Sequence, residues 1–499
     1  MSIRDQTCTL GIDLGTSGVK AVLLADDGSL RAQASAPLQV SQPRPLWSEQ
    51  SPADWWRALD TALDELRAHA DPRQWAQVRA LAVAGQMHGA VLLDRAAAVL
   101  RPAILWNDGR SQAQCIELES REPATRRITA NRAMAGFTAP KLMWVAAHEP
   151  ELFARIATVL LPKDWLVWQL AGVMSTDTSD AAGTLWLDVA ARRWSDPMLA
   201  ATGMRLGQMP TLHEGPDAVG TLLPQWASRW GLPGGVRVAA GAGDNAAGAL
   251  GVGVVRSGDA LLSLGTSGVI FSATDAARGN PERGVHTFCH ALPGVWHHMA
   301  VMLSASSAMS WWARMAASTP AELLDVLPVG GLRPAAPLFL PYLSGERTPH
   351  ADPSSTGGFI GLTHAHDRDD LSYAVAEGVA FAFADGLEAL REAGSRPARL
   401  LAIGGGARSD SWLQLLADVL STPVDRPAGA EVGPALGAAR LALVSLGHAT
   451  KAVMRAPPAA RAFEPDRGRT RALAARLERF RSAYAPLRAL NEHLTEGLS

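Results

Sequence analysis

The sequence predicts an α/β protein made of two domains with a ligand cleft between them. Three observations lead to this prediction. The six residues LGTSGV occur at 14–19 and again at 264–269, each time between two apolar stretches. Apolar segments with strand character alternate with segments of helical periodicity in both halves of the chain. A chain of 499 residues also exceeds the length at which one hydrophobic core usually stops growing.

The first copy lies within a predicted β-meander. Residues 9–38 indicate three short strands, with turns at 15–18 and at 27–28, the second of which is a hairpin dipeptide. A helix should follow from Pro52, with Ser51 as its N-cap, and then the apolar strand ALAVAG. This order of strands and helix predicts that the first half of the chain forms an α/β domain.

The second copy repeats the order of strand, glycine turn and strand, so a duplicated architecture is the simplest explanation. Beyond it we expect a long helix over 370–393, the strand RLLAIGGG, and two helices over 409–420 and 433–447. Glycine and alanine crowd residues 231–248, which indicates a boundary there. We expect domains over 1–240 and 241–499, with the extreme C-terminal helices packing back on the first.

The composition argues against several classes of protein. The chain is 47% hydrophobic and 19% charged, with a formal net charge of −2, and it lacks the basic surface expected of nucleic-acid or membrane-surface binders. The three cysteines are isolated from one another, which argues against a disulfide framework and a thiolate metal site. We find no secretory leader and no membrane-spanning stretch, so we expect a cytoplasmic protein acting on small molecules.

The two LGTSGV turns have the features of phosphate-binding loops. Glycine lets backbone N–H groups converge and lets a charged oxygen approach closely. Neighbouring hydroxyls can donate to phosphate oxygens. An ordinary tight hairpin would look similar, but the repetition favours phosphate binding. The candidate residues are Gly15, Thr16, Ser17, Gly265, Thr266 and Ser267.

A third glycine-rich loop, GAGDNA at 241–246, matches the G-x-G-x-x-A dinucleotide fingerprint. Asp244 lies where a pyrophosphate would approach, and two anions there would repel. The acidic residue expected about 20 positions later is also missing. We therefore interpret Asp244 as facing a substrate hydroxyl, with Asn245 as a second hydrogen-bonding group. An NAD-dependent oxidoreductase remains the alternative.

Other polar residues follow predicted strands. Asp13 ends the first strand, where it could hold Mg²⁺ on phosphates through water or cap the turn. Met87 and His88 stand between two glycines and could meet a ligand or belong to the core. Trp106 could stack on a sugar or be structural. The glycines at 404–406 could admit a flat ring, and no GxxxxGK[ST] motif occurs.

The sequence resembles the FGGY family of carbohydrate kinases nearly end to end. The resemblance rests on GIDLGTSGVKA, SLGTSGV, GAGDNAAG, GGGARS and GPALGAARLA. It implies two actin-like, ribonuclease-H-like domains, each contributing one hairpin to the phosphates of ATP. It also implies that Asp244 is the catalytic base and that Asp13 organises Mg²⁺ and the phosphates. The implied adenosine-site residues are Gly404, Gly405, Gly406 and Ser409.

GQMHG and WNDGR resemble the members that phosphorylate xylulose and differ from glycerol kinases. The implied reaction transfers the γ-phosphate of ATP to the terminal hydroxyl of D-xylulose. The implied sugar-site residues are Met87, His88, Trp106, Asp244 and Asn245. The family signature around Lys141 is met except at Ala147, and a second segment departs at Ala376; neither departure touches the proposed chemistry. Kinases for another ketopentose or polyol, and a non-catalytic actin-like sensor, remain alternatives. A homodimer is expected from the family.

Overall fold

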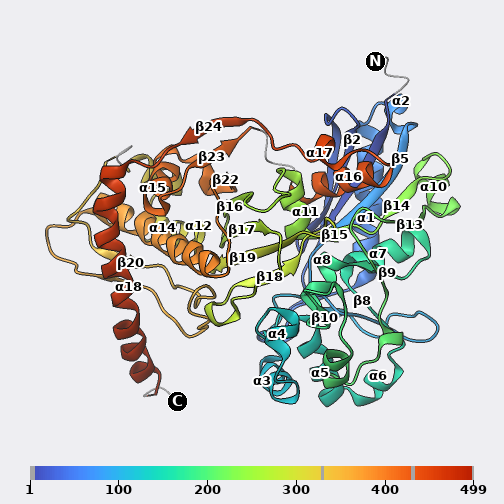
Figure 1. The fold of residues 1–499 in the computed structure, drawn as a ribbon, viewed down its shortest axis with the longest axis horizontal. Coiled ribbons are helices and arrows are strands. Elements are labelled where there is room, and N and C mark those ends of the chain that lie inside the picture. The colour runs from blue at the N-terminus through green and yellow to red at the C-terminus, as the bar shows by residue number, and fades with distance from the viewer. Residues whose placement is uncertain (1–5, 328–330, 429–432, 497–499) are drawn as a thin grey trace.

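The computed structural model describes residues 6–327, 331–428 and 433–496, and it is organised around two seven-stranded sheets (Figure 1). One sheet is built from the first half of the chain and the other from the second half. The structure confirms the predicted two-domain α/β architecture.

The first sheet has the order β13-β14-β5-β1-β2-β3, and β15 also pairs with β5. β1, β2 and β3 form an antiparallel meander, whereas β5 runs parallel to β1 and β14 runs parallel to β5. The strands are β1 (Cys8–Leu14), β2 (Gly18–Ala25), β3 (Leu30–Pro37), β5 (Val78–Gly85), β13 (Ala218–Thr221), β14 (Arg237–Ala239) and β15 (Ala242–Gly243).

The second sheet has the order β18-β19-β17-β16-β22-β23-β24 and repeats the same topology. β16, β17 and β19 form the meander, and β22 and β23 are its parallel neighbours. The strands are β16 (Ala260–Leu264), β17 (Gly268–Thr274), β18 (His286–Cys289), β19 (Trp296–Met302), β22 (Leu400–Ile403), β23 (Val424–Pro427) and β24 (Ala459–Phe463). Both LGTSGV copies therefore form the first turn of a meander, which confirms the predicted duplication.

Helices and short strands complete the first half. The predicted helix at 52 is α1, whose Trp55, Leu59, Leu63 and Leu66 are buried. Ser51 precedes it in extended conformation but makes no side-chain cap. The helices are α1 (Pro52–His69), α2 (Pro72–Trp75), α3 (Gln112–Arg121), α4 (Thr125–Thr129), α5 (Thr138–His148), α6 (Pro150–Arg155), α7 (Pro162–Ala171), α8 (Thr178–Ala181), α9 (Asp196–Ala201) and α10 (Pro224–Trp230). The short strands are β4 (Glu49–Gln50), β6 (Val91–Leu93), β7 (Ala103–Ile104), β8 (Thr158–Leu160), β9 (Ser175–Asp177), β10 (Leu187–Asp188), β11 (Arg193–Trp194) and β12 (Thr211–His213).

The second half contains the three predicted helices as α14, α15 and α16. Its elements are α11 (Asp244–Gly251), α12 (Ser306–Met315), α13 (Pro320–Asp325), β20 (Leu338–Leu340), β21 (Gly358–Ile360), α14 (Arg368–Glu392), α15 (Asp410–Leu420), α16 (Gly433–Ser445), α17 (Thr450–Val453) and α18 (Arg467–Glu496).

The chain returns to the first domain after building the second sheet. α16 lies against β1 and β5 of the first sheet and packs closely on α11 (Figure 1). The final helix α18 packs instead on α14, α15 and β20 of the second domain. β15, at residues 242–243, still pairs with β5, so the first sheet extends beyond residue 240. The division at 240/241 stays a prediction. The expectation that the extreme C-terminal helices pack on the first domain is wrong for α18, and the helix that packs there is the earlier α16.

Glycine at position 437 makes the close approach of α16 to α11 possible. A Cβ atom at Gly437 would lie 1.8 Å from the carbonyl oxygen of Ala247. We expect Gly437→Val to lower the free energy of unfolding by about 3 kcal/mol, because the two helices must separate. Urea titration of the variant measures this. Gly207→Val is the control, since nothing lies within 4 Å of a Cβ there. Equal stability of both variants would contradict the prediction.

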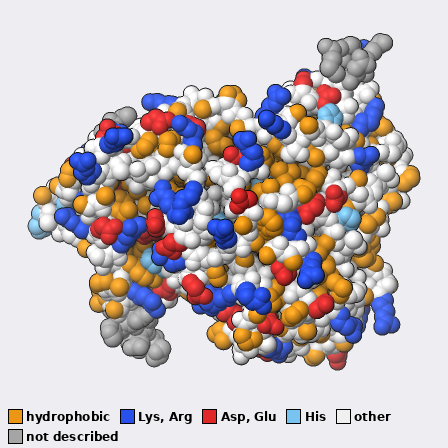
Figure 2. All heavy atoms as spheres, viewed as in Figure 1, with side chains coloured by type: hydrophobic (Ala, Val, Ile, Leu, Met, Phe, Trp, Pro, Cys, Tyr) orange, Lys and Arg blue, Asp and Glu red, His pale blue; other side chains and the backbone are white. Residues whose placement is uncertain are grey.

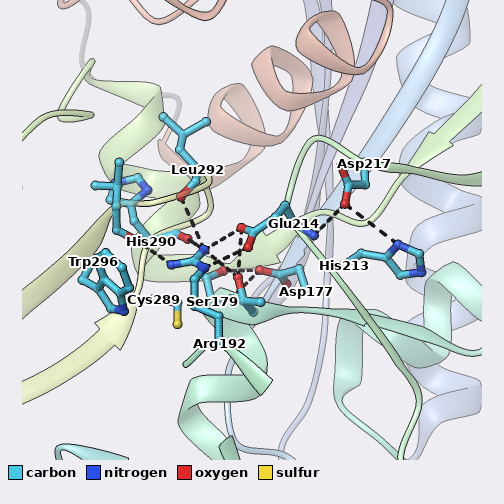
Figure 3. A network of polar contacts seen from close by, with 12 residues as sticks. Asp177, Ser179, Arg192, His213, Glu214, Asp217, Cys289, His290, Leu292 and Trp296 are labelled. Carbon is cyan, nitrogen blue, oxygen red and sulfur yellow. Dashed lines mark hydrogen bonds and ion pairs between the residues drawn. The ribbon is translucent and has the colours of Figure 1, made fainter. Parts of the chain in front are cut away.

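Arg192 joins the two domains (Figure 3). Its guanidinium donates to Glu214 Oε1 over 2.8 Å and to Thr178 Oγ1 over 2.8 Å, both in the first half. It also donates to three carbonyl oxygens in the turn 290–295 of the second domain. The guanidinium carbon lies 5.2 Å from the ring centre of Trp296. A planar cation with five N–H donors can bind hydrogen-bond acceptors of both domains at the same time.

The surface mixes both signs of charge. On the face drawn in Figure 2, basic and acidic side chains are interspersed. Among the described residues, every helix is too short or too polar to cross a bilayer. Cys8, Cys115 and Cys289 are all buried, and none of the three forms a disulfide.

Candidate active site

The polar residues of the first domain gather at one edge of its sheet. Asp13 lies in β1 beside Ala84 of β5, and the segment 86–88 follows β5 directly. Gly243 pairs with Gly85, so Asp244 begins α11 at the same edge. Because β1, β5 and β15 run parallel, their carboxyl ends converge, which is where open α/β sheets bind ligands.

Asp244 is the first residue of a helix, where a negative charge is favoured. Its Oδ1 accepts hydrogen bonds from the backbone N–H of Asn245 over 2.7 Å and from that side-chain amide over 2.8 Å. Its Oδ2 accepts none from any described residue. Burial raises the pKa of Asp244 to about 6, against the effect of the Asn245 bonds. One oxygen is therefore fixed and the other remains available as a proton acceptor.

Asp13 carries a buried oxygen that lacks a partner. Its Oδ1 is buried and has no hydrogen bond within the described part of the chain, which argues against the turn-capping alternative. Burial and, to a smaller extent, the charge of Asp244 raise the pKa of Asp13 to about 7, although Lys20 opposes both. Within the described ranges no cluster of three or more His, Cys, Asp or Glu could hold a metal. The neighbouring carboxylates of Asp13 and Asp244 do suit a Mg²⁺ ion that is bound mainly by phosphates and water.

The first LGTSGV turn is tied to the predicted sugar segment. The N–H of Gly15 donates to the carbonyl of Gly18 over 2.9 Å and closes the turn. Thr16 Oγ1 donates to Gln86 Oε1 over 3.0 Å and accepts from Trp106 Nε1 over 3.0 Å. The Thr16 proton is therefore already used inside the protein. Backbone N–H groups and the exposed Ser17 are the donors that remain for phosphate.

Trp106 serves two purposes in this arrangement. Its indole N–H holds Thr16, while the side chain is 44% exposed. The ring is therefore available to stack on a ligand, as the sequence suggested. Its position beside the first turn is fixed by a hydrogen bond that the sequence did not reveal.

Met87 lies beside the residue that precedes Asp244, and His88 follows Met87 directly. A Cβ atom at Gly243 would lie 2.9 Å from Met87 Cγ, so Met87 packs directly on the residue that precedes Asp244. His88 has a φ of 70° and is partly exposed, and its Nδ1 lies 2.6 Å from the carbonyl of Gly183. Burial lowers the pKa of His88 to about 3, so the ring is neutral at neutral pH. Nδ1 therefore carries the proton, and Nε2 can accept a hydrogen bond from a sugar hydroxyl.

Lys141 holds the backbone of His88 in place. Its fully buried Nζ donates to the carbonyls of His88 and Gly136, each over 2.8 Å. The sequence signature included this lysine but did not indicate what it does.

We expect Lys141→Met to raise the KM for sugar about tenfold or more, because the strained His88 backbone loses a buried hydrogen-bond donor. The KM for ATP should change little. Steady-state kinetics measure both constants, with the exposed Lys451→Met as the control. An unchanged sugar KM in Lys141→Met would exclude this anchoring role.

The second domain contributes a separate group of glycines. The turn at 265–267 follows β16, and the carbonyls of Gly265 and Thr266 accept from the start of α12. Gly404, with a φ of +93°, lies against the backbone of Leu264, so the turn after β22 adjoins the second LGTSGV turn. A Cβ atom at Gly405 would contact nothing within 4 Å, which leaves open space above it.

Gly406 and Ser409 are used partly for structure. A Cβ atom at Gly406 would lie 2.9 Å from Ser306 Oγ and 2.9 Å from the Trp412 ring, and Ser409 Oγ caps α15 by accepting from the N–H of Trp412. The buried alanines and Gly437 of α16, from the segment GPALGAARLA, face α11 and the first sheet. Across the described residues, no hydrogen bond or ion pair joins the second-domain glycines to the Asp13 and Asp244 group. A ligand held by both groups would have to bridge them.

A buried ionic cluster behind Asp244 was not predicted. Lys163 Nζ pairs with Asp164 and, over 2.9 Å, with Asp177, and all three side chains are fully buried. The backbone N–H of Ser179 donates to Asp177 over 2.8 Å, and Ser179 Oγ accepts from the N–H of Gly243 over 3.1 Å. The cluster thus fixes the residue before Asp244. The acidic run TDTSDA was the only available signal in the sequence.

Comparisons with known proteins decide the family. The model of the FGGY carbohydrate kinase N-terminal domain matches residues 8–251, and that of the C-terminal domain matches residues 260–446. The chain belongs to the FGGY family of carbohydrate kinases. It is therefore a phosphotransferase that uses ATP, and the oxidoreductase and sensor alternatives are set aside.

Individual relatives resemble the chain over almost its whole length. A xylulose kinase of Escherichia coli is 50% identical over 96% of this chain and 99% of its own. A crystal structure described as a xyloylose kinase from Brucella ovis is 48% identical, has a TM-score of 0.94 and covers 96% of this chain and 99% of its own. The xylulose kinase of Rhodospirillum rubrum is 31% identical, with a TM-score of 0.90 and coverage of 97% and 99%.

Proposed function

We propose that this FGGY kinase transfers the γ-phosphate of ATP to the terminal hydroxyl of D-xylulose, giving D-xylulose 5-phosphate and ADP. The observation that carries the proposal is the full-length similarity to xylulose kinases at up to 50% identity. The local geometry supports it, because Met87 packs beside Asp244 and His88 presents a free acceptor nitrogen on the same segment.

Asp244 is the proposed catalytic base. The terminal hydroxyl of the sugar donates to the free Oδ2 of Asp244, while Asn245 keeps the carboxylate in one orientation. Phosphoryl transfer passes through a loose transition state, in which the hydroxyl proton leaves late. Orientation of the attacking oxygen by Asp244 therefore matters more than basicity, although its raised pKa also brings it nearer the operating pH.

The two glycine turns are proposed to hold the phosphates of ATP, and the turn 404–406 with Ser409 to receive the adenosine. Asp13, with its unpartnered buried oxygen, would hold Mg²⁺ directly or through water. The ion would neutralise charge on the phosphates when bound. Backbone N–H groups and the Ser17, Thr266 and Ser267 hydroxyls orient the phosphate oxygens.

The test is ADP release with Mg²⁺ and ATP, measured across D-xylulose, D-ribulose, L-xylulose, gluconate and glycerol. We expect release to depend on sugar and to peak with D-xylulose. A peak with another polyol would retain the kinase and reject xylulose as its substrate. Strong ATP hydrolysis without sugar would contradict a site that excludes water before the sugar binds.

Two further expectations remain predictions. Sedimentation of the purified protein would test the homodimer, and fractionation of cells would test the cytoplasmic location.

A further inference from the structure

Arg347 lies on a firmly held segment of the second domain. The N–H of Thr348 donates to the carbonyl of Val301 over 3.0 Å, and Thr348 Oγ1 accepts from the N–H of Val301 over 3.0 Å. The buried Glu346 accepts from the N–H groups of Leu303 and Arg347, over 2.9 and 2.7 Å. The segment is thus fixed to β19, and Arg347 has a defined position.

Arg347 adjoins an aromatic cluster formed by both domains. The cluster consists of His88 and Phe137 from the first half and His286 and Phe288 from β18. Ring centres of His88 and Phe137 are 4.8 Å apart, and those of Phe137 and His286 are 5.7 Å apart. Arg347 Nη1 lies 3.4 Å from His286 Nε2. The side chain therefore reaches from the second domain to the group that contains His88.

The tautomer of His286 shows which group donates in the contact between Arg347 Nη1 and His286 Nε2. The amide of Asn131 is oriented by the backbone of Thr287, to which Nδ2 donates over 2.7 Å and from which Oδ1 accepts over 3.1 Å. The same Oδ1 lies 3.3 Å from His286 Nδ1, so Nδ1 must carry the proton. Burial keeps the pKa of His286 well below its usual value, so the ring is neutral. Nε2 therefore accepts from Arg347.

The rest of the guanidinium lacks protein partners. Arginine has five N–H donors, and within the described ranges only the contact with His286 uses one of them. Arg347 forms no ion pair there and is partly exposed. Burial lowers its pKa, and Glu346 opposes this only in part. Oxygen atoms of a ligand can accept hydrogen bonds from the unused N–H groups of such a partly desolvated cation.

The order of side chains indicates which part of the ligand lies there. Met87 packs on Gly243, which precedes Asp244, and its terminal methyl also lies against Gly183, which contacts the His88 ring. A five-carbon sugar has an extended carbon chain of about 5 Å. With its terminal hydroxyl at Asp244, the sugar would pass Met87 and bring its carbonyl end toward His88 and Arg347.

We propose that Arg347 is a substrate-binding residue that donates hydrogen bonds to the oxygen atoms at the carbonyl end of the acceptor sugar. This inference rests on the proposed function. A guanidinium only donates and a carbonyl oxygen only accepts, so the pair favours a ketose over the corresponding polyol. A contact of this kind, made across the domain interface, also requires both domains for sugar binding.

The experiment compares sugar binding by wild type, Arg347→Met and Arg347→Lys, with Arg314→Met as the control on an exposed arginine of the second domain. Dissociation constants for D-xylulose and xylitol are measured by calorimetry without ATP. We expect D-xylulose to bind about 10- to 100-fold more weakly to Arg347→Met, whereas xylitol changes by less than about threefold. Arg347→Lys should recover part of the loss, because it keeps the charge but not the planar donor geometry.

The outcomes separate the inference from the proposed function. Unchanged D-xylulose affinity in a folded Arg347→Met protein overturns the inference and leaves the kinase in place. Equal losses for D-xylulose and xylitol overturn the carbonyl contact. If circular dichroism shows that Arg347→Met does not fold, the dissociation constants of Arg347→Lys for D-xylulose and xylitol are compared with those of wild type instead. Unchanged D-xylulose affinity, or equal losses for both ligands, then overturns the inference. Failure of the wild type to bind any sugar or release ADP overturns both.

Discussion

Asp244→Ala should lower kcat for the sugar by about 10² to 10⁴-fold, the usual range for loss of a general base. The variant removes the only free carboxylate oxygen that we place at the attacking hydroxyl. The KM for ATP should change little, because the adenosine and phosphate loops are otherwise intact. Steady-state kinetics measure the effect, with the exposed Asp275→Ala as the control.

The same assignment has a pH signature. Since the pKa of Asp244 is about 6, wild-type kcat should fall as the pH drops below that value and the carboxylate takes up a proton. The Asp244→Ala variant should lose this limb of the profile. Near-normal turnover in the variant, or a wild-type profile that stays flat down to pH 5, would refute Asp244 as the base.

Asp13→Asn should strongly lower kinase activity and yet stabilise the metal-free protein. Burial and the charge of Asp244 raise the pKa of Asp13 to about 7, so the folded state holds the Asp13 proton more tightly than the unfolded state. The resulting stabilisation is fully present below about pH 4 and is lost as the pH rises through 7. The loss amounts to about 4 kcal/mol at pH 8. An amide has no such dependence, so the variant should unfold later than wild type at pH 8 and equally at pH 4.

Urea unfolding in the presence of a chelator, at pH 4 and at pH 8, measures the difference between the two proteins. Kinase activity of Asp13→Asn should fall by at least about 10²-fold, because the charge that faces the phosphates is lost. If the variant were no more stable than wild type at pH 8, the ionised carboxylate of Asp13 would not destabilise the folded protein, contrary to what its buried oxygen without a hydrogen-bond partner predicts.

The repeated LGTSGV turns made the duplicated meander predictable, because glycine spacing and apolar strands are local signals. Asp244 could be selected as a candidate from the sequence, since a carboxylate in a glycine-rich loop contradicts pyrophosphate binding. Its place at the start of α11 depends on β15 pairing with β5, which is a long-range contact.

Other features could not be read from sequence because they depend on which residues meet in three dimensions. The proton of Thr16 is used by Gln86, 70 positions away. Lys163 adjoins only one carboxylate in the sequence, Asp164, whereas three carboxylates surround it in the structure. Arg347 meets His286 only because β18 and the segment after β20 both lie beside β19. Ser409 stays a proposed adenosine contact, and the sequence did not reveal that its hydroxyl also caps α15.

The path of the chain has a practical use. β1 begins in the first domain, whereas α18 ends on the second, far from β1 in the view of Figure 1. Fluorophores attached near the start of β1 and near the end of α18 would therefore sit on different domains. Any rotation of one domain against the other would change energy transfer between them. Energy transfer between these two fluorophores can therefore report domain motion on nucleotide or sugar binding in single molecules, without a change to any residue of the site.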